Sequence, residues 1–188
     1  MELTIEDKKI LLIAARNSIK NIFKRTLVNK PDFELFTNMK QKAGAFVTLT
    51  INNRLRGCIG FIFSDNYLFD TVCTAAVEAA VGDPRFPILS EKEFNHIQIE
   101  VSVLSPPFKM NSYEEIIIGK HGLIVDEKEG KGLLLPQVPI EHNMDKDEYL
   151  TSLCRKAGLR SNLWKEKLLN IKMFTATVFS EKEVFNNE

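Results

Sequence analysis

The stretch from residue 55 to residue 60 places a single thiol in a strand-like run, between an arginine and a glycine. Residues i and i+2 of a β-strand share a face, so Arg56, Cys58 and Gly60 are expected to point the same way. A neighbouring positive charge favours the thiolate, which is the reactive form of cysteine. A glycine inside a strand marks a place where something needs the vacated space. The spacing therefore predicts an open, positively charged notch beside the sulfur.

Two interpretations of Cys58 are open at this point. Free cysteine is among the most buried residue types, so the thiol fills the core of a sheet in the first interpretation. A buried charge needs a partner, so Arg56 favours the second, a polar site in which Cys58 is a nucleophile or contacts a ligand. We take Cys58 as the candidate catalytic residue. Cys73 and Cys154 lie among alanines and leucines on expected helices and are predicted to be core residues.

Arg56 and Glu100 are the first pair of candidate binding residues. The planar fork of the arginine either holds an anionic substrate or pairs with a structural carboxylate. Glu100 is the expected partner of Arg56, because it lies on the polar side of a strand that should join the same sheet.

Three further candidate binding residues lie later in the chain. Asp83 and Arg85 belong to a proline-rich loop, residues 83–87, that suits a rigid pocket wall. The alternative is a structural Asp–Arg loop with Phe86 in the core. Gln137 follows three leucines and a proline, where its amide either satisfies backbone groups or faces a cleft. The three histidines are too scattered for a metal-ligand pattern, so we predict no metal site, and no cofactor follows from the sequence.

The bulk composition limits the classes of function. The 188 residues carry equal numbers of acidic and basic side chains, which argues against a general nucleic-acid binder. No apolar run approaches the ~20 residues of a membrane-spanning helix, and the acidic N-terminus lacks the basic start of a signal peptide. Three widely spaced cysteines are unlike a secreted disulfide framework. We therefore expect a cytoplasmic protein.

Helical and strand-like patterns are mixed along the chain. Helices are expected at residues 5–27, 66–81 and 146–157, and a hairpin at 44–51 and 54–62 around an Asn-Asn turn. Further strands are expected at 97–103, 116–118, 123–125, 133–135 and 171–179. These patterns predict an α+β fold, a mostly antiparallel sheet packed with helices, with a smaller second lobe.

Five stretches of the sequence resemble, in order, the signature of the AMMECR family, also called AmmeMemoRadiSam system protein A. They are residues 55–60, 83–87, 99–106, 132–138 and 154–159. The resemblance implies one AMMECR-type domain over residues 1–188, with room for a larger and a smaller subdomain. It also implies a Memo-like protein and a radical SAM protein as partners. Radical chemistry would then belong to the partner, because this chain lacks a closely spaced cysteine cluster for an iron–sulfur centre.

Three functions compete on these observations. The first is an enzyme or ligand-binding protein centred on Cys58, with Arg56 and Arg85 binding an anionic or planar polar group of a small molecule. The second is a non-catalytic adaptor that docks its partners through the same notch. The third is RNA binding through the basic flank of the first helix together with a second basic group. It is ranked last, since charge on helices is usually a solvated face. The second group is Arg155, Lys156, Arg160, Lys165 and Lys167.

Overall fold

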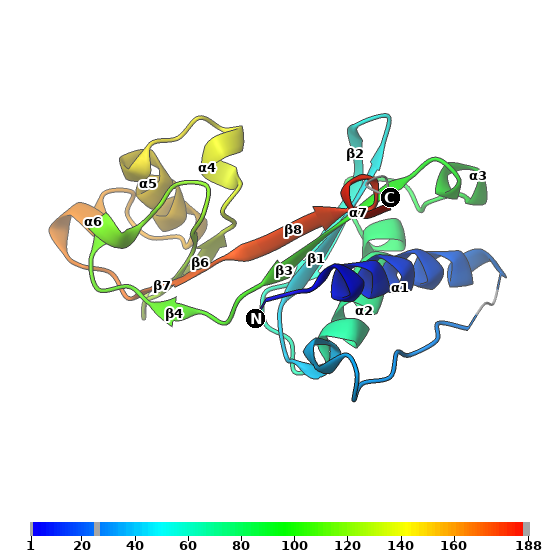
Figure 1. The fold of residues 1–188 in the computed structure, drawn as a ribbon. Helices are drawn as coiled ribbons and strands as arrows, with labels where there is room; N and C mark the ends of the chain where they lie inside the picture. Colours follow the sequence, from blue (N-terminus) through cyan, green and yellow to red (C-terminus); the bar gives the residue numbers. More distant parts are fainter. Residues whose placement is uncertain (1, 25–26, 186–188) are drawn as a thin grey trace. The chain divides into compact units, whose positions relative to one another are not determined.

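The protein, described here by a computed structural model for residues 2–24 and 27–185, divides into two compact units (Figure 1). The first unit runs to Leu104 and resumes at Thr177, and the second is Ser105–Ala176. Each unit has its own four-stranded sheet and its own hydrophobic core. The predicted α+β class is confirmed.

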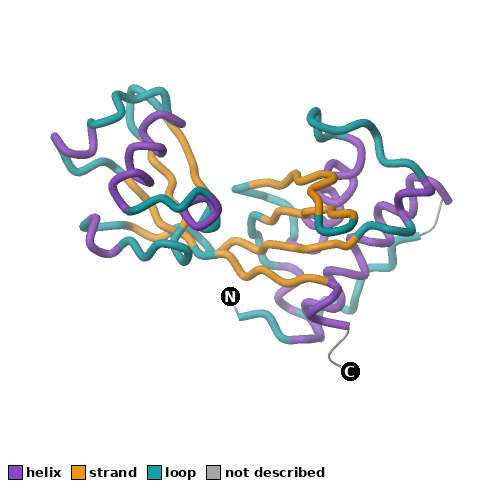
Figure 2. The backbone as a smooth tube through the Cα atoms, turned by 90° about the horizontal axis from the view of Figure 1, so that it is seen from above, coloured by secondary structure: helices purple, strands orange, loops and turns teal. Residues whose placement is uncertain are grey.

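In the first unit, the sheet has the strand order β2-β1-β3-β8, and the two long helices pack on one of its faces (Figures 1 and 2). The strands are β1 (Ala45–Ile51), β2 (Arg54–Phe61), β3 (Gln98–Leu104) and β8 (Ala176–Ser180). The long helices are α1 (Ile5–Lys24) and α2 (Leu68–Val81), and the short ones are η1 (Thr37–Lys40), α3 (Glu91–Phe94) and α7 (Glu181–Phe185). Strand β2 is therefore an edge strand of the sheet.

The two long helices form for reasons that the sequence shows. Thr4 and Asp7 cap α1 reciprocally, each backbone N–H donating to the side chain of the other at 3.0 and 3.1 Å. Small alanines on α2 allow a close approach to the sheet. A Cβ atom at Gly57 of β2 would lie 2.1 Å from the carbonyl oxygen of Ala79, so only glycine fits beneath this helix. This close packing of α2 on β1 and β2 forms part of the hydrophobic core of the first unit.

The second unit has the strand order β4-β7-β5-β6. Its strands are β4 (Phe108–Lys109), β5 (Gly122–Asp126), β6 (Lys131–Leu134) and β7 (Ile171–Phe174), and its helices are η2 (Tyr113–Glu115), α4 (Val138–Glu141), α5 (Lys146–Lys156) and α6 (Leu163–Glu166). A capping box of Asp145 and Glu148 starts α5, whose Tyr149 and Leu153 are fully buried. The predicted helix at this position is confirmed.

Two strand predictions differ from the structure. Residues 116–118 are not a strand, because the carbonyl of Ile117 accepts the N–H groups of Lys120 and His121 and closes a turn at Gly119, whose φ is +79°. The single final strand expected at 171–179 is divided into β7 and β8, which belong to different sheets. Apolar periodicity continues through both strands, so the break was invisible in the sequence.

Candidate functional site

Arg56 lies at a β-bulge, which changes its relation to Cys58. Leu49 of β1 pairs with Gly57, but the next residue, Thr50, pairs with Leu55, so Arg56 is the extra residue of β2. A bulge interrupts the alternation of side chains along a strand. The common face expected for Arg56 and Cys58 is therefore lost.

The guanidinium of Arg56 is held by the chain itself. Its Nε and Nη2 atoms donate to the carboxylate of Glu93 at 2.8 and 3.2 Å, and Nη2 also donates to the Pro87 carbonyl at 2.9 Å. The guanidinium carbon lies 5.9 Å from the ring centroid of Phe86. Hydrogen bonding from Arg56 and then from the Ser90 N–H lowers the pKa of Glu93 to about 2. The structural interpretation of Arg56 is the one these contacts support.

The prediction that Glu100 is the ion-pair partner of Arg56 is wrong. Strand β1 lies between β2 and β3, so Glu100 is two strands away from Arg56. The carboxylate that reaches Arg56 is Glu93, which lies on the short helix α3.

Glu100 instead belongs to the same row of cross-strand neighbours as Cys58, with Thr48 between them. Thr48 of β1 pairs with Cys58 on one side and with Glu100 on the other. Because Ala45, Val47 and Leu49 face the helical core, the row lies on the face of the sheet opposite α1 and α2. The Thr48 hydroxyl donates to the Cys58 sulfur over 3.4 Å. The structure therefore places both Cys58 and Glu100 beside a threonine that the sequence did not single out.

Asp83 and Arg85 clamp the backbone of Cys58. The Cys58 N–H donates to Asp83 Oδ2 at 2.9 Å, and Arg85 Nη2 donates to the Cys58 carbonyl at 3.4 Å. Arg85 also donates through Nε and Nη2 to the Asp83 carboxylate at 2.9 and 2.7 Å. An edge strand has outward backbone groups without a strand partner, and this ion pair takes the place of the missing neighbour. The structure thus brings three predicted site residues together.

The two charged side chains of the clamp differ in their exposure to solvent. Asp83 is buried, and hydrogen bonds from Arg85 hold the pKa of its carboxyl well below the usual range. The Arg85 side chain is 55% exposed. The pKa of Arg85 is raised, first by its hydrogen bond to Asp83 and also by electrostatic interaction with Cys58. Arg85 is therefore a guanidinium that acts on Cys58 and still reaches solvent.

The glycine beside Cys58 does not leave an open slot. Gly60 pairs with Phe46 across the strands. A Cβ atom at Gly60 would lie 2.4 Å from both the Phe46 ring and the Ala45 carbonyl oxygen. The space is filled by an aromatic ring, and the predicted notch at this position is wrong.

Gln137 lies in the second unit, whereas the other site candidates lie in the first. It is the residue before α4, and its carbonyl accepts the N–H groups of Ile140 and Glu141. Its side chain is half-buried and forms no capping hydrogen bond. A binding role for its amide stays a prediction.

Two hollows in the described surface could hold a ligand, one beside Arg56 and one beside Tyr113 and Trp164. One, of about 550 Å³, lies at the turn end of the hairpin and is lined by Ile51, Asn52, Arg54, Leu55 and Arg56. Arg56 is the one candidate residue among them, and Cys58 is not part of this lining. The hollow therefore does not join the two residues into one site.

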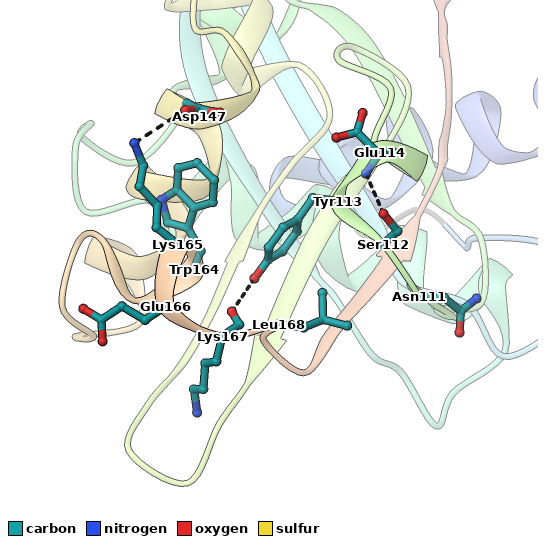
Figure 3. Close-up of a pocket in the computed structure, with 10 residues that line it drawn as sticks. All are labelled: Asn111, Ser112, Tyr113, Glu114, Asp147, Trp164, Lys165, Glu166, Lys167 and Leu168. Carbon is teal, nitrogen blue, oxygen red and sulfur yellow. Dashed lines mark hydrogen bonds and ion pairs between the residues drawn. The ribbon is translucent and has the colours of Figure 1, made fainter.

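The other hollow, of about 780 Å³, lies in the second unit around Tyr113 and Trp164 (Figure 3). Their rings meet edge to face at 5.9 Å. The Tyr113 hydroxyl donates to the Lys167 carbonyl and accepts the Leu169 N–H, and the indole N–H of Trp164 donates to Thr151. The polar atoms of both aromatic residues are used by the chain itself, so we do not take this hollow as the functional site.

Within residues 2–24 and 27–185, no helix combines the length and the apolar composition of a membrane span. No group of three or more His, Cys, Asp and Glu side chains there has an arrangement that could hold a metal ion.

Thr48 and Glu93 are the two residues that sequence reasoning missed. Glu93 forms a capping box with Ser90 at the start of α3, and nothing in the local sequence links it to Arg56. A two-residue turn at Asn52 and Asn53 without a bulge would pair Cys58 with Val47 and not with Thr48. The sequence pattern of the hairpin therefore predicts the wrong partner for Cys58, and it gives no sign that Thr48 lies beside the thiol.

Comparisons with known proteins agree with this fold. The AMMECR1 family model matches residues 12–179. Protein Mbar_A1807 of Methanosarcina barkeri is 43% identical over 177 residues, which cover 90% of this chain and 87% of that protein. A protein of Methanocella arvoryzae is 40% identical, over 96% of this chain and 94% of its own length. The crystal structure of uncharacterized protein PH0010 from Pyrococcus horikoshii has a TM-score of 0.78 and 36% identity, covering 93% of this chain and 91% of that one. As its five signature stretches predicted, the chain belongs to the AMMECR1 family.

Proposed function

We propose that this AMMECR1-family protein is an enzyme or ligand-binding protein that contacts a small molecule through the Cys58 thiol. The observation that carries the proposal is the hydrogen bond from Thr48 to the sulfur, on a residue whose own N–H and carbonyl are both held by side chains. Such fixation is what a reactive or ligand-contacting group needs, because its geometry is set before the ligand arrives.

The other two cysteines lie in different surroundings. Burial raises the pKa of the Cys73 thiol and of the Cys154 thiol, which disfavours their thiolate forms. Cys154 is fully buried in the core of the second unit. These two thiols therefore serve as internal references for the behaviour of Cys58.

Arg85 is the group that we propose for binding an anionic or planar polar part of the ligand. Its guanidinium is half exposed and interacts electrostatically with Cys58. Arg56, the other predicted binding arginine, is only 8% exposed, and its fork is engaged by Glu93. Arg56 is therefore assigned a supporting role, holding the bulge in place.

Alkylation of the native protein tests this proposal. Iodoacetamide labelling followed by peptide mapping should show Cys58 reacting faster than Cys73, because burial raises the pKa of the Cys73 thiol and alkylation proceeds through the thiolate. In 8 M urea, roughly the strength that unfolds such domains, the three rates should converge. Equal rates for Cys58 and Cys73 in the native protein would rule out a selective thiol site.

Ligand binding can be tested without knowing the ligand. A low-molecular-weight cell extract should slow the alkylation of Cys58 in the native protein. The same extract should protect Arg85→Gln less, because the substitution removes the positive charge that receives an anionic group. Loss of protection in a matched surface variant, Arg160→Gln, would show that the effect is not specific to Arg85.

For partners, we propose a Memo-like protein and a radical SAM protein, on the basis of the family resemblance. A non-catalytic adaptor is the second candidate function. It is favoured by two exposed apolar side chains: Phe63, 66% exposed, follows β2, and Ile88, 67% exposed, follows the Asp83–Arg85 clamp.

Co-purification separates the enzyme from the adaptor. Cys58→Ser should keep partner binding and lose cellular function if the protein is an enzyme, but keep both if it is an adaptor. A Phe63→Ser, Ile88→Ser double variant should lose partner binding in the adaptor case.

RNA binding is not supported by the surroundings of the basic group. Lys165 pairs with Asp147 at 3.6 Å, and Lys167 pairs with Glu127 at 2.7 Å. Arg160 pairs with Glu166 at 2.6 Å. Their charges are largely neutralised by neighbouring carboxylates, which weakens attraction to phosphates.

A further inference from the structure

We infer that Thr48 is a positioning residue for the Cys58 site: its hydroxyl donates the hydrogen bond that orients the sulfur and favours the thiolate. The inference rests on the proposed function, because it matters only if the thiol meets a ligand. It also goes further than the proposed function. The sequence suggested that Arg56 favours the thiolate of Cys58, and we assign this role to the neutral hydroxyl of Thr48 on the neighbouring strand.

The strand register brings the two side chains into contact. The N–H of Cys58 points outward to Asp83, so Cys58 and Thr48 form a pair without hydrogen bonds between their backbones. In antiparallel sheets, side chains are closest in such pairs. The 3.4 Å separation of Thr48 Oγ1 and Cys58 Sγ follows from this register.

Both ends of the contact have little freedom. The backbone of Cys58 is held on both sides by Asp83 and Arg85. Thr48 is β-branched and lies on the central part of β1, between β2 and β3, so its χ1 angle is restricted. A hydroxyl held in this way gives the sulfur a fixed hydrogen-bond donor.

Thr48 also lies between Cys58 and Glu100 in the strand pairing. Glu100 follows Thr48 in the same row, one strand further from Cys58. Two strand spacings amount to roughly 9–10 Å, and a like charge in direct contact would disfavour a thiolate. Thr48 therefore supplies a donor to the sulfur, and the backbone of Glu100 lies two strands away from Cys58.

Replacing the hydroxyl by a methyl group tests the inference. In Thr48→Val, the alkylation rate of Cys58 at pH 7 should fall about tenfold, and the pH at which the rate is half-maximal should rise by about one unit. Thr48→Ser keeps the hydroxyl and should restore the wild-type pH profile. Thr50→Val is the matched control, because Thr50 lies on the same strand, is also half-buried and pairs with Leu55 instead of Cys58. Its profile should be unchanged.

The possible outcomes separate the inference from the proposed function. If Thr48→Val keeps the wild-type pH profile while Cys58 remains the fastest-labelled thiol, the positioning role is overturned and the thiol site stands. If wild-type Cys58 reacts no faster than Cys73, both fail together. Should the valine variant not fold, Thr48→Ala removes the same hydroxyl without adding a methyl group and is read by the same criterion.

Discussion

The carboxylate of Asp83 accepts the backbone N–H of Cys58 at 2.9 Å, so a side chain stands where a neighbouring strand would be. The same carboxylate is held by Arg85, which closes the clamp by donating to the Cys58 carbonyl. This clamp explains two features at once. It protects the edge of β2 from pairing with other strands, and it fixes the backbone of the residue that we propose as the ligand contact.

Removing the clamp should loosen Cys58. We expect Asp83→Ala to lower the free energy of unfolding by about 1–3 kcal/mol, because the Cys58 N–H and the Arg85 guanidinium lose their acceptor. Urea unfolding measures the loss, and amide exchange at Cys58 should be faster. Asp83→Asn keeps an acceptor oxygen and should lose less. Unchanged exchange at Cys58 in the alanine variant would contradict the role given to Asp83.

The ion pair of Arg56 and Glu93 should make stability depend on pH in acid. The pKa of Glu93 is lowered in the folded protein from 4.5 to about 2. Such a group contributes stability that is present above pH 4.5 and is lost as the pH falls through about 2. Glu93→Gln should therefore melt at a lower temperature than wild type at pH 7, and the two melting curves should converge near pH 2.

Glu91→Gln is the control for this effect. Glu91 belongs to the same short helix, but its ion pair with Lys24 is exposed on both sides. Exposed pairs contribute little to stability, so this variant should follow wild type at every pH. A constant difference between Glu93→Gln and wild type from pH 7 to pH 2 would mean that packing, and not charge, causes the loss.

Gly60→Ala should be destabilising because the space beside this glycine is already filled. The new Cβ atom would meet the Ala45 carbonyl oxygen and the Phe46 ring, both at 2.4 Å. Overpacking of this kind costs about 1–3 kcal/mol. The control is Gly82→Ala, whose Cβ would meet mainly the flexible end of Glu78, so that side chain can move away. Thermal unfolding of the two variants should differ clearly, and equal stabilities would contradict the packing described for Gly60.

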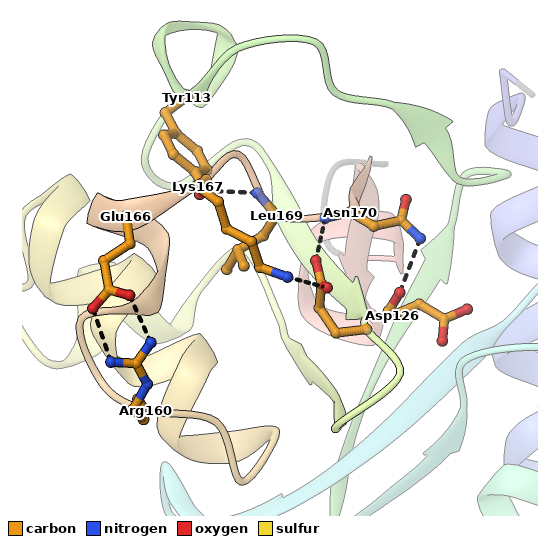
Figure 4. Close-up of polar contacts among 8 residues, drawn as sticks. Tyr113, Asp126, Arg160, Glu166, Lys167, Leu169 and Asn170 are labelled. Carbon is orange, nitrogen blue, oxygen red and sulfur yellow. Dashed lines mark hydrogen bonds and ion pairs between the residues drawn. The ribbon is translucent and has the colours of Figure 1, made fainter.

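Tyr113→Phe should destabilise the second unit. The hydroxyl of Tyr113 accepts the Leu169 N–H at 3.0 Å and donates to the Lys167 carbonyl at 3.0 Å, which ties η2 to the segment before β7 (Figure 4). Its removal leaves two backbone groups without these partners, a loss of about 1–3 kcal/mol. Fluorescence of Trp164, the single tryptophan, reports unfolding locally. Tyr67→Phe, at an exposed position of the first unit, should leave that signal unchanged.

Much of the local structure could be predicted from the sequence, because its causes are local. The Asn-Asn turn fixes the hairpin of β1 and β2, and side chains of Asp145 and Glu148 start α5. The chain alone also identified Cys58, Asp83 and Arg85 as candidate site residues, in two separate stretches of the family signature. These residues do meet, although their contact is a clamp on the backbone.

The face on which Cys58 lies was decided only by the tertiary structure. A regular two-residue hairpin would pair Cys58 with Val47, which is fully buried in the core. The bulge at Arg56 moves the register by one residue, and Cys58 pairs with Thr48 instead. Two distant contacts accompany the bulge: Arg56 binds Glu93, 37 residues further along the chain, and Gly57 packs against Ala79. Such contacts between segments far apart in sequence leave no local pattern, so the sequence identified the thiol and only the folded chain determined its surroundings.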